Sequence, residues 1–294
     1  MLYICPTPIG NLEDVTLRVL SVLRSVELIA CEDTRHTRIF LDRHGVGTRL
    51  VSFHEHNEEQ RMGMLLPLLR DGKDVAVVSD AGMPGVSDPG FTLVRACAAE
   101  DLPVTVLPGP SAVPTALVAS GLPADRFAFI GFLVRGANKL TEQIAVFDGT
   151  GAAVVAFEAP RRLAASLKAI GERWPGRRVA VCRELTKLHE QVLRGTAAEV
   201  IAALPDPVRG EIVLVLEPAG RTGLGVTAAD GARAGAEAAG PMAVAGGEAA
   251  VRAALRDMLD AGMGTKRAAA VVAGLTGLPK RQVYELAVAL QESC

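Results

Sequence analysis

The stretch VAVVSDAGMPGVSDPG, residues 75–90, joins an unbroken apolar run to a loop rich in glycine, proline and aspartate. A short apolar, β-branched run that ends in turn residues indicates a strand buried on both faces. In the loop, three glycines allow the backbone to approach a ligand closely, and Asp80 and Asp88 supply fixed acceptors. Ligands of open parallel sheets bind at the carboxyl ends of the strands. The stretch therefore predicts an α/β sheet and the edge that binds a nucleoside or amino-acid cofactor.

The same order of strand, polar loop and helix recurs on both sides of this stretch. Residues 2–5, 27–31, 50–53 and 104–107 are strand-like, with helical apolar spacing between them. These runs are followed by PTPIGN (6–11), EDTR (32–35), HEHNEE (54–59) and PGPSA (108–112). Because strands alternate with helices, we expect residues 1–110 to form an α/β domain with a mostly parallel sheet.

Strand patterns continue beyond residue 110 with different loops. The strand-like runs 153–157, 179–182 and 212–216 include two that are followed by EAPRR (158–162) and RELTKLHE (183–190). We therefore expect a second α/β domain over residues 111–218. The Ala/Gly-rich segment 219–247 is typical of a flexible linker. Residues 248–294 carry three helical patterns, one beginning near Thr265 and one after Pro279.

Composition excludes several classes of protein. The chain has 294 residues, of which 49% are hydrophobic, and a formal net charge of −2, so neither a disordered chain nor a generally basic nucleic-acid binder is expected. Its five cysteines are scattered without a CxxC pair, which favours reduced thiols over a disulfide framework or zinc ribbon. We find no secretion signal and no apolar run of about 20 residues, so we expect a cytoplasmic protein.

Several loops carry groups suited to acid-base chemistry. Mixed charges that face a cleft shift one another's pKa values, and EDTR and RELTKLHE supply Glu32, Asp33, Arg35, Arg183, Glu184, Lys187, His189 and Glu190. A structural ion-pair network is the alternative. His54 and His56 alternate like paired metal ligands, but no third ligand is evident, and we expect no metal. The absence of GxGxxG and GxxxxGK[ST] argues against nicotinamide and triphosphate sites.

Charge is distributed unevenly along the chain. Residues 1–110 hold 10 basic and 15 acidic side chains, whereas residues 158–195 hold 9 basic and 4 acidic ones. The basic stretch suits phosphate neutralisation, with a solvated helix face as the alternative. Residues 246–294 hold 6 basic and 5 acidic side chains, so RNA docking and simple surface solubility stay open for this segment.

In their order along the chain, eight motifs resemble the ribosomal small-subunit RNA (cytidine-2′-O)-methyltransferase I family of the tetrapyrrole methylase superfamily. They are PTPIGNLED, EDTR, SFHEHNE, SDAGMPGVSDPG, PGPSA, GFL, EAPRR and RELTKLHE. The resemblance covers residues 1–218, and the tail resembles this family's helix-turn-helix-like module. It implies two α/β domains of the tetrapyrrole methylase (class III methyltransferase) type, S-adenosyl-L-methionine as cofactor, and a homodimer. It also implies 2′-O-methylation of a cytidine in the decoding region of 16S rRNA in the small ribosomal subunit.

The resemblance also assigns residues to the cofactor. They are Pro8, Asp80, Gly82, Val86, Asp88, Ser111, Ala112, Thr115, Ala116, Leu185 and Ile212. Met83 departs from the threonine that is more frequent in the family, and Ala159 and Arg161 depart from serine and histidine.

A ribose hydroxyl is a poor nucleophile while it is protonated, so a side chain is expected to accept or orient its proton. We expect Asp33, Lys187 or Glu190 to do so, and Arg35, Arg161, Arg162 and Arg183 to contact RNA. Three other functions stay open on the sequence alone. They are methylation of a corrin or porphyrin precursor, noncatalytic RNA binding in ribosome assembly, and metal-dependent phosphoester hydrolysis.

Overall fold

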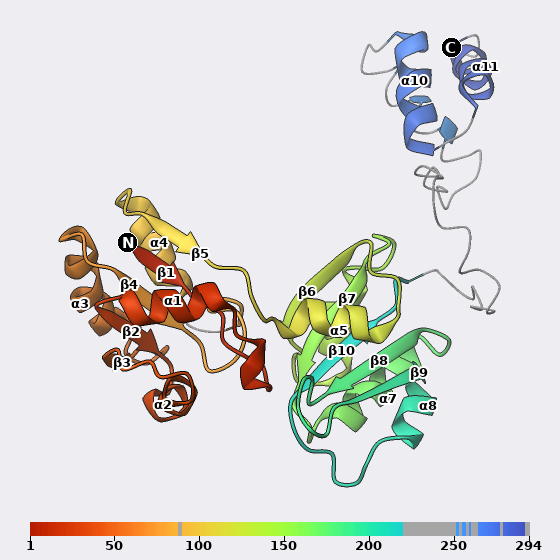
Figure 1. Cartoon of the computed structure of the whole chain (residues 1–294). Helices are drawn as coiled ribbons and strands as arrows, with labels where there is room; N and C mark the ends of the chain where they lie inside the picture. The colour runs from red at the N-terminus through yellow and green to blue at the C-terminus, as the bar shows by residue number, and fades with distance from the viewer. Residues whose placement is uncertain are drawn as a thin grey trace. The chain divides into compact units, whose positions relative to one another are not determined.

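The computed structural model describes residues 1–87, 90–219, 251–252, 255–256, 259, 264–276 and 279–291. The chain divides into two compact units, Met1–Leu224 and Gly225–Cys294. The first unit contains two five-stranded sheets, and the second contains helices α10 (Thr265–Thr276) and α11 (Lys280–Gln291) (Figure 1).

The first sheet is parallel throughout, with the strand order β3-β2-β4-β1-β5. Its strands are β1 (Leu2–Ile4), β2 (Leu28–Cys31), β3 (Leu50–Ser52), β4 (Val75–Val78) and β5 (Val104–Val106). The intervening helices are η1 (Leu12–Asp14), α1 (Leu17–Ser25), α2 (Thr34–Arg43), α3 (Glu58–Arg70) and α4 (Phe91–Ala99). Every residue of β2 and β4 is buried, as expected for central strands that helices cover on both faces.

The chain leaves the neighbouring strands β2 and β4 in opposite directions. Helix α2 leads from β2 to β3 at one side of the sheet, whereas α4 leads from β4 to β5 at the other side. Such a reversal opens a crevice at the carboxyl ends of the two strands. Glu32 and Asp33 follow β2, and Ser79 and Asp80 follow β4, so the fold places these residues at the crevice.

The second sheet has the order β6-β7-β10-β8-β9 and is mostly antiparallel, with a parallel pairing between β6 and β7. Its strands are β6 (Phe127–Phe132), β7 (Ala153–Glu158), β8 (Arg178–Arg183), β9 (Gln191–Thr196) and β10 (Ile212–Leu216). Helix α5 (Ala112–Ser120) packs into one apolar cluster of this sheet. Helices α6 (Ala137–Ala145), α7 (Leu163–Arg173) and α8 (Ala197–Ala202) pack into another.

The structure confirms the expected fold class, two α/β sheets followed by a helical module. The boundary expected at residues 110 and 111 falls between β5 and α5. Strands β6 and β9 were not among the expected strands. Helix α10 begins at Thr265, and α11 begins directly after Pro279. The expected linker, 219–247, lies outside the described residues except for its first position. Among the residues that are described, no helix is long and apolar enough to cross a membrane.

Candidate active site

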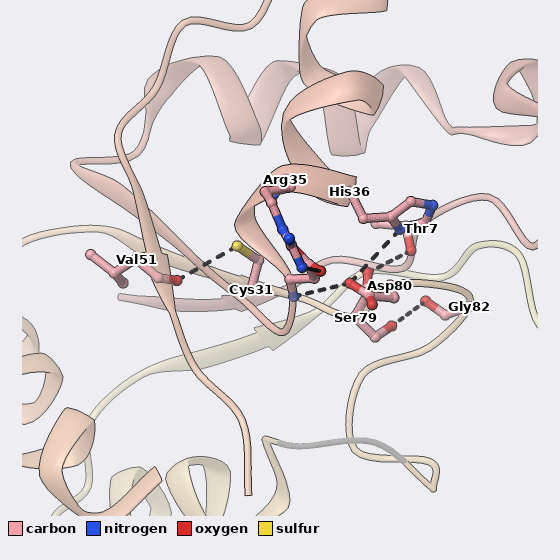
Figure 2. A network of polar contacts seen from close by, with 9 residues as sticks. Thr7, Cys31, Arg35, His36, Val51, Ser79, Asp80 and Gly82 are labelled. Carbon is pink, nitrogen blue, oxygen red and sulfur yellow. Dashed lines mark hydrogen bonds and ion pairs between the residues drawn. The ribbon is translucent and has the colours of Figure 1, made fainter. Parts of the chain in front are cut away.

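The loops that follow β1 and β4 are fastened to each other at the edge of the first sheet. The hydroxyl of Thr7 donates to the carbonyl of Ser79 at 3.0 Å, and the Ser79 hydroxyl donates to the carbonyl of Gly82 at 3.1 Å. The backbones of Thr7 and Gly82 exchange two further hydrogen bonds, of 2.9 and 3.0 Å. Thr7 and Ser79 are buried, and Gly82 has a φ of 83° that favours glycine. The two glycine- and proline-rich motifs therefore form one rigid platform (Figure 2).

Asp80 links this platform to the end of β2. Its Oδ1 atom accepts a hydrogen bond from the backbone N–H of Asp33 at 3.2 Å and lies 3.8 Å from Nδ1 of His36. Figure 2 shows the side chains of His36 and Asp80 turned toward each other. Polar groups that follow β2 and β4 thus meet at the crevice of the first sheet.

A cavity of about 500 Å³ is lined by residues from both sheets. The first sheet contributes Glu32 and the loop around residues 80–87, and the second contributes residues 157–160 and 210–213. The start of α5, residues 111–113, completes the wall. A volume of this size and a wall that is mainly apolar with a few polar groups are typical of small-molecule sites.

A smaller hollow of about 180 Å³ adjoins the large cavity. The two share Ile9, Asp80, Ala81 and Glu211 as wall residues. Other residues of the small hollow include Thr7, Pro8, His36, Ile39 and Lys187. The site therefore has room for a second ligand group beside the first.

The loop after β1 closely approaches the RELTKLHE segment. A β-carbon added at Gly10 would lie 2.5 Å from Cγ of Lys187 and 2.9 Å from the carbonyl oxygen of Leu185. The backbone N–H of Asn11 donates to Oγ1 of Thr186 at 3.0 Å. Thr186 has a φ of 64°, so this contact includes a strained backbone, which is often found at functional sites.

Ion pairs hold the RELTKLHE segment in shape. Nζ of Lys187 lies 2.9 Å from Oε1 of Glu184 and 2.8 Å from Oε2 of Glu211. A backbone hydrogen bond from Glu211 and the nearby Lys187 ammonium lower the pKa of Glu184. Burial disfavours the charged form of Lys187, but its bonds to Glu211 and Glu184 outweigh burial and raise its pKa. Lys187 is therefore a charged ammonium group whose charge is balanced by the two glutamates.

The carboxylates near the crevice have different environments. Burial, followed by the nearby charges of Asp80 and Glu55, raises the pKa of Glu32. Asp33 is half-buried and accepts hydrogen bonds from the side chain and backbone of Arg35, which lower its pKa to about 2. The two adjacent residues thus differ in proton affinity.

Six of the expected cofactor residues line the large cavity, namely Asp80, Gly82, Val86, Ser111, Ala112 and Ile212. Pro8 lines the small hollow instead. Thr115 donates to the carbonyl of Ser111 at 2.7 Å. Ala116 and Leu185 belong to the buried apolar cluster that α5 forms with the second sheet. Asp88 lies outside the described residues.

The structure also locates the residues expected to act in catalysis. Asp33 caps the start of α2, where its Oδ1 atom accepts from the N–H of Arg35 at 2.8 Å. Lys187 lines the small hollow. Glu190 is exposed, and its Oε2 atom accepts from the N–H of Thr186 at 2.6 Å. All three side chains therefore already have polar partners.

The four arginines expected to contact RNA differ in accessibility. The Arg35 side chain is 90% exposed but is paired with Asp33. Arg162 bonds to the carbonyl of Leu133 and to the buried Glu158. Arg183 donates to Oε1 of Gln191 and to the carbonyl of Arg209. Arg161 is exposed, with no ion pair to another described residue, and directly follows the cavity residues Ala159 and Pro160.

The sequence did not identify several residues of the cavity wall. These are chiefly Phe132, Phe157, Glu158, Gly210 and Glu211. Phe132 belongs to the GFL motif and Glu158 to the EAPRR motif, which were recognised without individual roles for these residues, and Phe157 ends the expected strand 153–157. Gly210 and Glu211 directly precede β10 and belong to no recognised motif.

Comparisons with known proteins agree with this architecture. Residues 1–201 match the family Tetrapyrrole (Corrin/Porphyrin) Methylases, and residues 245–291 match the RsmI C-terminal HTH domain. The solved uroporphyrin-III-C-methyltransferase of Thermus thermophilus is 23% identical, with a TM-score of 0.52 over 74% of this chain and 93% of that chain. This likeness supports the fold.

Relatives in sequence are more similar. Ribosomal RNA small subunit methyltransferase I of Hydrogenobaculum sp. is 46% identical over 73% of this chain and 94% of its own length. The protein of the same name from Synechocystis sp. is 38% identical over 99% of this chain and 98% of its own length. The chain therefore belongs to the ribosomal RNA small subunit methyltransferase I family, within the tetrapyrrole methylases.

Proposed function

We propose that this chain transfers a methyl group to the ribose 2′-hydroxyl of a cytidine in the decoding region of 16S rRNA. Membership of the family makes it an S-adenosyl-L-methionine-dependent rRNA methyltransferase. The nucleotide and the acceptor atom are the proposed part, and they rest on the motifs in the sequence. The structural observation that supports methyl transfer is the cavity of about 500 Å³ at the crevice of the first sheet.

The cavity fits S-adenosyl-L-methionine in size and charge. The Asp80 carboxylate lines the cavity and favours a ligand that carries a sulfonium and an ammonium group, whereas Glu158 and Glu211 are paired with Arg162 and Lys187. The start of α5 also lines the cavity, and free N–H groups at a helix N-terminus suit a carboxylate. When bound, this cofactor supplies an electrophilic methyl carbon attached to sulfur.

The fastened loops of this chain contribute to catalysis by positioning. Methyl transfer is an in-line displacement, so a rigid wall that holds the acceptor oxygen and the methyl carbon in line lowers the barrier. Thr7, Ser79 and Gly82 supply that rigidity through their hydrogen bonds. The small hollow beside the cofactor cavity is assigned to part of the acceptor nucleotide.

The RNA substrate follows from the family, and the proposed form of the substrate is 16S rRNA within the small ribosomal subunit. Arg161 is the arginine best placed for a phosphate, because it is exposed at the rim of the cavity. Arg35 and Arg183 are proposed as further RNA contacts, and Arg162 as a support for the rim. We also propose that the protein is cytoplasmic and acts as a homodimer.

Methyl transfer to purified small subunits tests this function. Subunits from a strain that lacks the enzyme are incubated with the protein and S-adenosyl-L-methionine carrying a labelled methyl group. We expect one labelled cytidine in the decoding region, with the label on the ribose. Subunits from the intact strain are the control and should accept little label. Label on a base, or label on a porphyrin precursor in place of RNA, would contradict the proposal.

A further inference from the structure

A group that takes the proton from the acceptor hydroxyl has to lie in the wall of the cofactor cavity. In a reactive arrangement the acceptor oxygen is about 3–3.5 Å from the methyl carbon, and a base works within hydrogen-bond reach of that oxygen. Asp33 and Glu190 are not among the residues that line the cavity. The carboxylates that do line it are those of Glu32, Asp80, Glu158 and Glu211.

Glu158 and Glu211 are held by cations and hydrogen-bond donors. Oε1 of Glu158 lies 2.5 Å from Arg162 and accepts from the N–H of Ala159 at 2.6 Å, while Oε2 accepts from Ser166 at 2.5 Å. Oε2 of Glu211 lies 2.8 Å from Nζ of Lys187. Approach of the acceptor hydroxyl to either carboxylate would therefore compete with contacts that already hold its oxygens.

Asp80 also has a structural role. Its Oδ1 atom accepts the backbone N–H of Asp33 and faces His36, and these contacts join the ends of β2 and β4. A shift of Asp80 toward a substrate oxygen would break the contact that shapes the crevice. Its position favours binding of the cofactor over proton transfer.

Glu32 differs from the other three carboxylates. Within the described part of the chain its carboxylate has no hydrogen bond and no ion pair. It is half-buried and follows β2 directly at the crevice. The groups that face it are Asp80 after β4, His54 and Glu55 after β3, and Asp33 beside it. Burial and the negative neighbours raise its pKa, which brings a general base closer to the working pH.

We propose that Glu32 is the general base of the methyl transfer, an inference that rests on the proposed function. The Glu32 carboxylate accepts the proton of the ribose 2′-hydroxyl while the oxygen forms its bond to the methyl carbon. The bond between methyl and sulfur breaks, and its electron pair stays on the sulfur of the product, S-adenosylhomocysteine. The proton then passes from Glu32 to water. The structure thus favours the first acidic residue of EDTR over Asp33, the second.

The test compares Glu32→Gln and Glu32→Asp with the wild-type protein in single-turnover methylation of small subunits. We expect Glu32→Gln to lower the rate by about 10²–10⁴-fold, because it keeps the shape but loses the base. Glu32→Asp should recover part of that loss. The wild-type rate should rise with pH as Glu32 loses its proton, and this rise should lie above the pH range in which ordinary carboxyl groups titrate. Glu32→Gln should lack this acidic limb of the pH profile. Glu59→Gln, an exposed site on α3, is the matched control and should retain the wild-type rate.

Affinity for S-adenosylhomocysteine, measured by calorimetry, separates catalysis from binding. Glu32→Gln should bind this product within about threefold of the wild-type affinity, so that only the rate changes. A Glu32→Gln rate within about fivefold of wild type, or a tenfold loss of affinity, would overturn the assignment. An acidic limb that persists in Glu32→Gln would also overturn it. Failure of the proposed function has a different signature, because the wild-type protein itself would then transfer no methyl group to the subunit.

Discussion

Arg161 and Arg162 are adjacent in the sequence but have different surroundings. Arg161 is exposed at the cavity rim, whereas Arg162 neutralises Glu158, whose side chain is 0% exposed. A buried carboxylate that loses its cation keeps the cost of burial without the compensating attraction. Stability around Glu158 therefore depends on Arg162, whereas Arg161 is exposed for the proposed contact with RNA.

Arg162→Ala should lower the free energy of unfolding by about 2–3 kcal/mol, less than for a fully buried pair because Arg162 is partly exposed. Arg161→Ala should change it by less than about 0.5 kcal/mol. The measurement is urea unfolding of both variants. Arg161→Ala should also weaken binding to small-subunit RNA and reduce the salt slope by about 1. Equal destabilisation by the two substitutions would contradict this division of roles.

The sequence predicted acid-base chemistry in EDTR and named Asp33 as a candidate, whereas the cavity wall contains the neighbouring Glu32. Glu32 and Asp33 both follow β2, and which of them faces the cavity depends on the backbone path into α2. Asp33 serves as the N-cap of that helix, a role that its residue type does predict. The burial and the charges that surround Glu32 come from β3 and β4, which are distant in sequence. They could not be read from the motif.

Among the helices and strands, those of the first sheet were predicted well and those of the second less well. The first sheet has short, apolar, evenly spaced strands, so its pattern is local. Strand β6 was missed because Gly131, with a φ of 68°, interrupts it, and its register with β7 shifts between Phe129 and Phe132. Strand β9 was missed because its burial is only partial and its sequence includes Arg194 and Gly195. The antiparallel pairing of β10 depends on long-range contacts.

Helix α8 provides a test of local structure. Thr196 and Glu199 form a capping box at its start, in which Oγ1 of Thr196 accepts from the N–H of Glu199 and the Glu199 carboxylate accepts from the N–H of Thr196. Hydrogen bonds from Thr196 lower the pKa of Glu199. The box joins β9 to α8, whose Ala197 and Val200 are buried in the core of the second sheet.

Thr196→Ala should destabilise the protein by about 1 kcal/mol, because it removes one half of the box. Thr196→Ser keeps the hydroxyl and should recover most of the loss. Thermal or urea unfolding measures both changes. If the alanine and serine variants lose the same stability, the hydroxyl has no capping role.

Of the two units of the molecule, the first, Met1–Leu224, contains every residue that lines the candidate site. The second unit has its own apolar cluster, which includes Leu255, Val272 and Val283. Lys266 and Arg267 are exposed there, so RNA docking by this unit stays a prediction beside simple surface solubility.

We place the methyl donor in the cavity that residues of both sheets line. The most direct test is calorimetric titration of S-adenosylhomocysteine into the wild-type protein, Ala112→Phe and Ala98→Phe. Ala112 lines the cavity, whereas Ala98 is exposed on α4 and serves as the matched control. We predict saturable one-site binding for the wild type and Ala98→Phe, and a loss of at least tenfold, about 1.4 kcal/mol, for Ala112→Phe. Undiminished binding by Ala112→Phe, or no binding by the wild type, would contradict this location of the methyl donor.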